Sequence, residues 1–254
     1  MLSSLDRSLM ILEYLSKRKS AGVSEIAEMF DVDKSTVTRI LQTFAKHDIV
    51  AKDEYTQKYR MSNGTLQFSY QIVLNNRIIQ IARPLLVKLS NITNETVRLC
   101  AISHDCIYIL DQVQAKDDSV LRNADIPGTR KPLYCSAIGK VALAYMPENE
   151  SREILEHLER RYYTENTICD VEQLMEQLRE IRIRGYALNT AEYTDRAYCV
   201  AVPVFDDKGM ANYSIGFSGM TDYRRVPERF EQIITCMKES AQKLTREYRE
   251  EIKR

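Results

Sequence analysis

Apolar residues recur at helical spacing in two short segments near the start of the chain, and a polar turn separates them. The first segment begins near Ser24, which is placed to cap a helix. The second segment follows Asp33, and its apolar positions form one stripe at i, i+3, i+4 and i+7: Val37, Ile40, Leu41 and Phe44. A stripe of this kind faces a core. The pattern therefore predicts two packed helices between Val23 and His47, joined by a tight turn.

The opposite face of the second predicted helix is polar and carries no acid between residues 34 and 46. Its candidate DNA-contacting residues are Lys34, Ser35, Thr36, Thr38, Arg39, Gln42 and Lys46. Short hydroxyl and amide side chains reach base edges and phosphates, while arginine and lysine neutralise the backbone and contact guanine. This composition favours a helix that reads duplex DNA. The alternative is an ordinary solvated helix face.

The flanking segments complete a winged helix-turn-helix. Residues 3–19 predict a preceding helix whose leucines recur at helical spacing and point inward: Leu5, Leu9, Leu12 and Leu15. Residues 49–51 and 58–61 predict two short strands around the polar turn 53–56, which form the wing. Acidic Asp53 and Glu54 at the tip argue against deep insertion of the wing into a groove.

The remaining pattern predicts a mixed helix and sheet domain. Helices are expected at 64–76, 77–89, 148–160, 170–184 and 227–250, and strands at 96–103, 106–113, 186–190, 199–205 and 211–218. His104-Asp105 is expected to join the first two of these strands, and the polar segment 115–131 to form a mobile flap. We therefore predict three parts: a winged helix-turn-helix DNA-binding domain at 1–63, a linker helix at 64–76, and a mixed helix and sheet domain at 77–254.

Small residues mark a helix start between Pro132 and Lys140. Two interpretations remain open for this segment. The helix start could present backbone N–H groups to an anion. Alternatively, the small residues could only permit close packing.

Composition narrows the function classes. The 254 residues are enough for two domains, and 44% hydrophobic residues are enough for real cores. Lys+Arg and Asp+Glu both total 36, so the protein does not coat DNA through bulk charge, and any DNA contact must be local. No apolar run is long enough to span a bilayer and no secretory pattern is present, so we expect a cytoplasmic protein. Six scattered cysteines without a CxxC pair and three histidines without chelating spacing predict free thiols, no metal and no cofactor.

In order and in residues, the chain resembles the IclR family of bacterial transcription regulators. The resemblance rests on DKSTVTRILQTF and YRMSNG in the first part, and on PGTRKPLYCSAIGK, GYALNTAEYTDRAYCVAVPVFDDKG and YSIGFSG in the second. It implies an α+β chain: a winged helix-turn-helix, a linker helix, and a C-terminal GAF-like α/β effector domain with a curved antiparallel sheet. It also implies homodimers or homotetramers on palindromic double-stranded operators, and a small effector that often carries a carboxylate.

The resemblance implies that residues 77–254 form an effector-binding and oligomerisation domain. The residues of its effector site would be Ser136, Ala137, Ile138, Glu192, Tyr193, Cys199, Ala201, Gly216 and Ser218. Two departures bear on the ligand. Many members have a serine where Gly216 stands, so a hydroxyl is missing; many have a glycine in the stretch where this chain has Thr194-Asp195-Arg196, which adds charge at the rim.

The leading prediction is thus a transcription regulator, with repression as its expected mode, whose operator binding responds to a small carboxylate or a sugar-derived acid. One alternative is a redox-sensing DNA-binding regulator that acts through Cys135 and Cys199. Another is an enzyme with a nucleophilic thiol at either cysteine. That chemistry needs a base and an oriented helper, and neither cysteine has a histidine nearby in sequence. No catalytic residue is therefore predicted.

Overall fold

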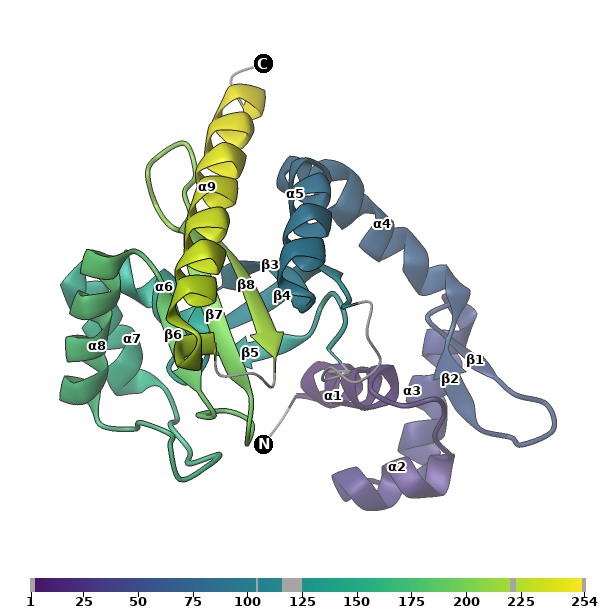
Figure 1. Cartoon of the computed structure of the whole chain (residues 1–254). Helices are drawn as coiled ribbons and strands as arrows, with labels where there is room; N and C mark the ends of the chain where they lie inside the picture. Colours follow the sequence, from purple (N-terminus) through teal and green to yellow (C-terminus); the bar gives the residue numbers. More distant parts are fainter. Residues whose placement is uncertain (1–2, 104, 116–124, 220–222, 253–254) are drawn as a thin grey trace. The chain divides into compact units, whose positions relative to one another are not determined.

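The computed structural model describes residues 3–103, 105–115, 125–219 and 223–252 (Figure 1). Contacts between residues divide the chain into two compact units, Met1–Asn75 and Asn76–Arg254. Each unit has a hydrophobic core of its own. Among the described residues no helix is both long and apolar enough to cross a membrane.

The first unit is a three-helix core with a strand hairpin. Its elements are α1 (Ser4–Ser16), α2 (Val23–Phe30), α3 (Lys34–Lys46), β1 (Val50–Lys52), β2 (Tyr59–Met61), a 3-10 turn (Asn63–Thr65) and α4 (Leu66–Asn75). The predicted helix pair and wing are therefore present. Ile26 of α2 and Val37 and Leu41 of α3 are fully buried, which confirms that the apolar stripe of α3 faces the core. Asp31 ends α2 in a left-handed conformation with φ of 50°.

Two details of this unit differ from the sequence prediction. The N-cap of α2 is Gly22, because the Glu25 carboxylate turns back to accept the backbone N–H of Gly22. Ser24 therefore lies inside the first turn. The predicted inward orientation of the α1 leucines is right for Leu15, which is buried, and wrong for Leu5 and Leu9, which are 67% and 53% exposed.

The wing is short, and a side chain fixes its turn. β1 and β2 pair antiparallel with Val50 opposite Met61. The Asp53 carboxylate accepts the backbone N–H of Thr56 at 2.7 Å and that of Tyr55 at 3.2 Å. These bonds to the ionised form hold the pKa of Asp53 below its usual value. The acidic residue at the tip is thus part of the turn itself.

A six-stranded antiparallel sheet forms the centre of the second unit, in the order β5-β4-β3-β8-β7-β6. Its strands are β3 (Thr96–Ser103), β4 (Cys106–Val113), β5 (Arg130–Pro132), β6 (Ala187–Thr190), β7 (Tyr198–Val204) and β8 (Tyr213–Gly219). β5 was not expected, because it lies at the end of the polar segment predicted as a flap; residues 116–124 of that segment and His104 lie outside the described residues.

Helices cover both faces of this sheet (Figure 1). On one face lie α5 (Arg77–Thr93), which runs through Pro84 without a break, and α9 (Pro227–Ile252). On the other face lie α6 (Ala137–Ala144), α7 (Glu148–His157) and α8 (Val171–Arg184). A 3-10 turn (Tyr223–Arg225) precedes α9. Strand alternation divides β3 between the faces: Val97 and Leu99 pack in the core with α5 and α9, and Cys100 packs in the core with α6 and α8. Arg98 shares the α6 face with Cys100.

Candidate functional site

The predicted DNA-contacting residues all lie on α3. Five of them are exposed, and Thr36 and Thr38 are half-buried. The Thr38 hydroxyl donates to the backbone oxygen of Lys34 at 2.7 Å, so its proton is used within the helix. Thr38 can therefore offer a partner only its methyl group and the lone pairs of its oxygen.

A groove between α1 and α3 continues this surface. It has a volume of about 470 Å³, and Thr36, Arg39 and Thr43 of α3 line it together with Ser4, Arg7 and Ser8 of α1. Sequence reasoning assigned α1 only to the core and therefore missed Arg7. The basic side chain of Arg7 adds to the positive charge that Arg39 brings to this groove.

The small-residue helix start in the second unit is closely packed. Ser136 is the N-cap of α6: its hydroxyl accepts the Gly139 backbone N–H at 3.1 Å and donates to the Pro132 backbone oxygen at 2.6 Å. A Cβ atom on Gly139 would lie 2.2 Å from the Leu133 backbone oxygen. The close-packing interpretation is therefore correct for Gly139, and the Ser136 side chain is already engaged in capping.

Glu192 is part of a buried ion pair. Its two carboxylate oxygens lie 2.5 and 2.6 Å from the Lys140 ammonium, which also donates to Gln177 Oε1 at 2.8 Å. Lys140 is 1% exposed and Glu192 6%. Burial raises the pKa of Glu192 and lowers the pKa of Lys140, and the attraction between the two charges opposes both shifts. Sequence reasoning named Glu192 but missed Lys140, its partner.

The sheet brings together several of the predicted effector residues. The Cys199 thiol on β7 donates to the Ser218 hydroxyl on β8 at 3.2 Å. Gly216 pairs with Ala201 across the same two strands, and a Cβ atom on Gly216 would meet Ile138 Cγ1 at 2.9 Å. The first turn of α6, which contains Ala137 and Ile138, therefore packs against the strands that carry Cys199, Ala201, Gly216 and Ser218.

A buried arginine joins this group. Arg98 on β3 is 2% exposed, lies opposite Gly216 on β8, and donates from Nη1 to Ser218 Oγ at 3.0 Å. Sequence reasoning read residues 96–103 as a strand without weighing this position. An arginine between Val97 and Leu99, inside a predicted strand, was the signal that could have identified it.

Polar side chains from the segment before α6 approach the same region. Lys131 Nζ lies 2.8 Å from Asp125 Oδ1 and 4.8 Å from the ring centre of Tyr193, a predicted effector residue. Asp125 Oδ2 in turn lies 3.7 Å from Arg98 Nη2. These contacts extend the group that was predicted from the sequence by two charged residues.

The redox-sensor and enzyme alternatives both require a reactive thiol at Cys135 or Cys199, and both thiols are poorly suited to reaction. All six cysteines are free. Burial raises the pKa of Cys135 to about 12 and raises the pKa of Cys199 above its usual value. A reactive thiol needs a lowered pKa. The described residues also contain no group of three or more His, Cys, Asp or Glu side chains that could hold a metal ion.

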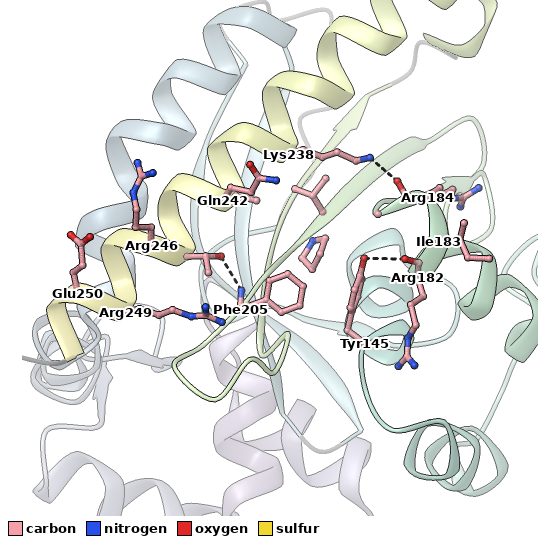
Figure 2. Close-up of a pocket in the computed structure, with 15 residues that line it drawn as sticks. Tyr145, Arg182, Ile183, Arg184, Phe205, Lys238, Gln242, Arg246, Arg249 and Glu250 are labelled. Atoms are coloured by element: carbon pink, nitrogen blue, oxygen red, sulfur yellow. Dashed lines mark hydrogen bonds between the residues drawn. The ribbon is translucent and has the colours of Figure 1, made fainter.

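A second groove lies at the other end of β7, between α9 and the corner where α8 leads to β6 (Figure 2). Its volume is about 690 Å³, and none of the predicted effector residues lines it. Two of its cationic side chains bind backbone oxygens: Lys238 donates to that of Arg184 at 2.6 Å, and Arg249 to that of Asp206 at 2.7 Å. These contacts give the cations a role at the ends of helices and strands.

Comparison with known proteins gives a consistent family assignment. The family pattern "Bacterial transcriptional regulator IclR C-terminal" matches residues 70–246, and "IclR helix-turn-helix domain" matches residues 4–54. The HTH-type transcriptional regulator KdgR of Escherichia coli is 32% identical over 245 residues, which are 96% of this chain and 91% of that protein.

Two solved structures show the same fold. The IclR transcriptional regulator from Alicyclobacillus acidocaldarius superimposes with a TM-score of 0.82 at 27% identity, over 98% of this chain and 99% of that one. An IclR homolog from Microbacterium hydrocarbonoxydans, solved in complex with 4-hydroxybenzoate, superimposes with a TM-score of 0.81 at 20% identity, over 97% and 99% of the two chains.

Proposed function

This chain belongs to the IclR family of bacterial transcriptional regulators, and on that premise we propose that a small carboxylate, such as a sugar-derived or aromatic acid, controls its binding to operator DNA. In this proposal the first unit reads the operator and the second unit binds the effector. The mode we propose is repression that the effector relieves.

The observation that carries the DNA half of the proposal is the exposed, acid-free face of α3. The residues we assign to operator contact are Lys34, Ser35, Thr36, Thr38, Arg39, Gln42 and Lys46. Arginine and glutamine can read base edges, whereas the lysines and hydroxyls suit phosphates. Asp53 at the tip of the wing is used in its own turn, so we assign the wing to the flanking backbone, through Lys52, Lys58 and Arg60.

The effector half of the proposal rests on the cluster of polar side chains between the sheet and α6, which includes Arg98, Cys199 and Ser218. The residues we assign to effector contact are Ser136, Ala137, Ile138, Glu192, Tyr193, Cys199, Ala201, Gly216 and Ser218. Hydroxyl, thiol and backbone groups would fix the orientation of a small polar ligand, while the alanines, Ile138 and the glycine shape its space. Because the Glu192 carboxylate is paired with Lys140, we assign Glu192 a contact role that depends on that pair. The Microbacterium structure supports a carboxylate ligand, because that protein has the same fold and was solved with 4-hydroxybenzoate.

The exposed apolar surface of α4 supports an assembly of two or four copies. Six apolar side chains of this helix are between 43% and 64% exposed: Leu66, Phe68, Tyr70, Ile72, Val73 and Leu74. A helix that is apolar on several sides is stable in water only when another surface covers it. We propose that a second copy of this chain supplies that surface, which would place two copies of α3 on a palindromic operator.

A thermal-shift screen tests the effector half first. The purified protein is mixed with small carboxylates, sugar acids and aromatic acids, and a ligand that binds the native state raises the melting temperature by mass action. An operator is selected in parallel from random duplex DNA. A hit that also changes operator affinity would support the proposal. Coupling must be reciprocal, so operator DNA must change the affinity for the hit by the same factor. A ligand that changes operator affinity without this symmetry would refute the proposal that the effector controls operator binding.

A further inference from the structure

One buried arginine of the second unit has unmatched hydrogen-bond donors. Arg98 Nη1 donates to Ser218, but among the described residues Nε and Nη2 have no acceptor within hydrogen-bonding distance. Asp125 Oδ2 lies 3.7 Å from Nη2, which is an ion pair but not a hydrogen bond. Buried charged donors without acceptors are costly, so a group of this kind calls for an explanation.

The two unmatched nitrogens belong to the same edge of the guanidinium. The N–H of Nε and the nearer N–H of Nη2 point in parallel, and this fork matches the two oxygens of a carboxylate. The same edge binds carboxylates elsewhere in this protein. Nε and Nη2 of Arg161 lie 3.0 and 2.8 Å from Glu159 Oε1, and Nε and Nη2 of Arg179 both donate to Glu148. In Arg98 this edge is buried, and no carboxylate of the described residues accepts hydrogen bonds from it.

We propose that Arg98 anchors the effector by binding its carboxylate through this edge, an inference that rests on the proposed effector-binding function. The local charge supports an anion. Lys131 holds Asp125 at 2.8 Å, so this single acid faces two cations, Arg98 and Lys131. The other nearby acid, Glu192, is already paired with Lys140. One ligand carboxylate would therefore balance the remaining charge.

A neighbouring acceptor narrows the ligand class further. Gln112 on β4 lies directly opposite Arg98 on β3, so the two side chains share a face of the sheet. Its Nε2 donates to the Asp125 backbone oxygen at 2.6 Å, whereas its buried Oε1 has no donor among the described residues. A ligand hydroxyl would satisfy this oxygen. The anchor thus suits a small hydroxy acid, whose carboxylate meets Arg98 and whose hydroxyl meets Gln112.

The test uses glycolate as the hydroxy acid and acetate as the same carboxylate without the hydroxyl. Thermal unfolding of the full-length protein is followed in each salt, with sodium chloride at equal ionic strength as the reference. The variants are Arg98→Met, Arg98→Lys and, as the matched control, Arg83→Met on α5, where the arginine is exposed and pairs with Asp111. We expect glycolate to raise the melting temperature of the wild type and of Arg83→Met, with acetate weaker. Arg98→Met should bind glycolate about 10- to 100-fold more weakly, as expected for lost charge-assisted bonds.

Each outcome decides the assignment. Arg98→Lys keeps the positive charge but lacks the two parallel N–H donors, so glycolate should no longer raise its melting temperature. This variant replaces Arg98→Met if that protein does not fold. Equal shifts in the wild type and both Arg98 variants would overturn the inference, as would a wild type that responds to glycolate no more than to chloride. Failure of the proposed function is a separate result: glycolate binding would depend on Arg98, while operator affinity would not respond to any acid of the screen.

Discussion

Lys140 and Glu192 form an ion pair that joins the middle of α6 to the chain just after β6, with Nζ 2.5 Å from Oε2 and both side chains buried. The pair ties the helix at the proposed effector site to the loop that carries Tyr193. Burial removes both charges from water, which is unfavourable, and only the attraction between the two charges offsets that cost. The stability of each buried charge therefore depends on the other residue.

Removal of one partner of this pair should be strongly destabilising. Lys140→Met leaves the Glu192 carboxylate buried without its cation, and Glu192→Leu leaves the ammonium without its anion. We expect each variant to lose about 3–5 kcal/mol of unfolding free energy, and the double variant to recover a large part of that loss. Urea denaturation of the four proteins measures the coupling. Losses that simply add in the double variant would show that the pair contributes little.

Arg39 and Lys46 should affect DNA binding differently. If Arg39 reads a base, Arg39→Ala should lose about 1–3 kcal/mol of discrimination between operator and random DNA. Lys46→Ala should weaken binding to every sequence and reduce the salt slope by about one. Fluorescence anisotropy on the selected operator and on a scrambled duplex, over a range of salt concentrations, measures both quantities. Equal losses on the two duplexes from Arg39→Ala would rule out base reading by this residue.

The buried thiols should resist alkylation in the native protein. With a pKa of about 12, roughly one Cys135 thiol in ten thousand is ionised at pH 8, and Cys100, whose pKa burial also raises to about 12, behaves alike. We expect iodoacetamide to leave both unmodified at pH 8, as mapped by peptide mass spectrometry. The thiolate fraction rises as pH approaches the pKa, so any modification should increase with pH.

A denatured sample is the control for that measurement, since unfolding removes the burial that raises both pKa values. Both thiols should then react at pH 8. Rapid native alkylation of Cys135, or operator binding that oxidant abolishes in the wild type but not in Cys135→Ser/Cys199→Ser, would restore the redox alternative.

Gly139 should not tolerate a larger side chain. Its added Cβ would lie 2.2 Å from the Leu133 backbone oxygen, so α6 or the preceding segment must shift. We expect Gly139→Ala to lose about 1–3 kcal/mol of stability, the usual cost of overpacking. Gly22→Ala, where the added Cβ meets nothing within 4 Å, is the matched control and should change stability less. Similar melting temperatures for both variants would contradict the close packing.

Local patterns account for most of what the sequence predicted correctly. The apolar stripe that includes Val37 and Leu41 predicted which face of α3 is buried. The apolar runs at 96–103 and 106–113, separated by His104-Asp105, predicted β3 and β4 with the observed bounds. β5 was missed because only three residues form it, and its structure comes from pairing with β4 over Cys106 to Tyr108. A polar segment that becomes a strand only by pairing with a neighbouring strand has no local sequence pattern that predicts it.

The site was harder to predict because its contacts cross the chain. Lys140 meets Glu192 52 positions later, and Arg98 meets Ser218 120 positions later. Sequence spacing carries no signal for such pairs until strand order and register are known. The family resemblance suggested Cys199 and Ser218, but it did not suggest Arg98, which we propose as an anchor because its Nε and Nη2 have no acceptor among the described residues.

The apolar stripe of α4 should control the oligomeric state. Leu66 and Tyr70 lie one turn apart, are 64% and 61% exposed, and line a groove of about 430 Å³ with Val73. If a second copy covers this stripe, Leu66→Glu/Tyr70→Glu places charges in the interface and should shift the protein toward monomers in sedimentation equilibrium. Gln71→Glu/Asn75→Glu adds the same two charges, also one turn apart, at exposed polar positions of the same helix that do not line this groove, and should leave the assembly unchanged. An assembly that survives the first pair of substitutions, or that both pairs disrupt equally, would mean that another surface holds the copies together.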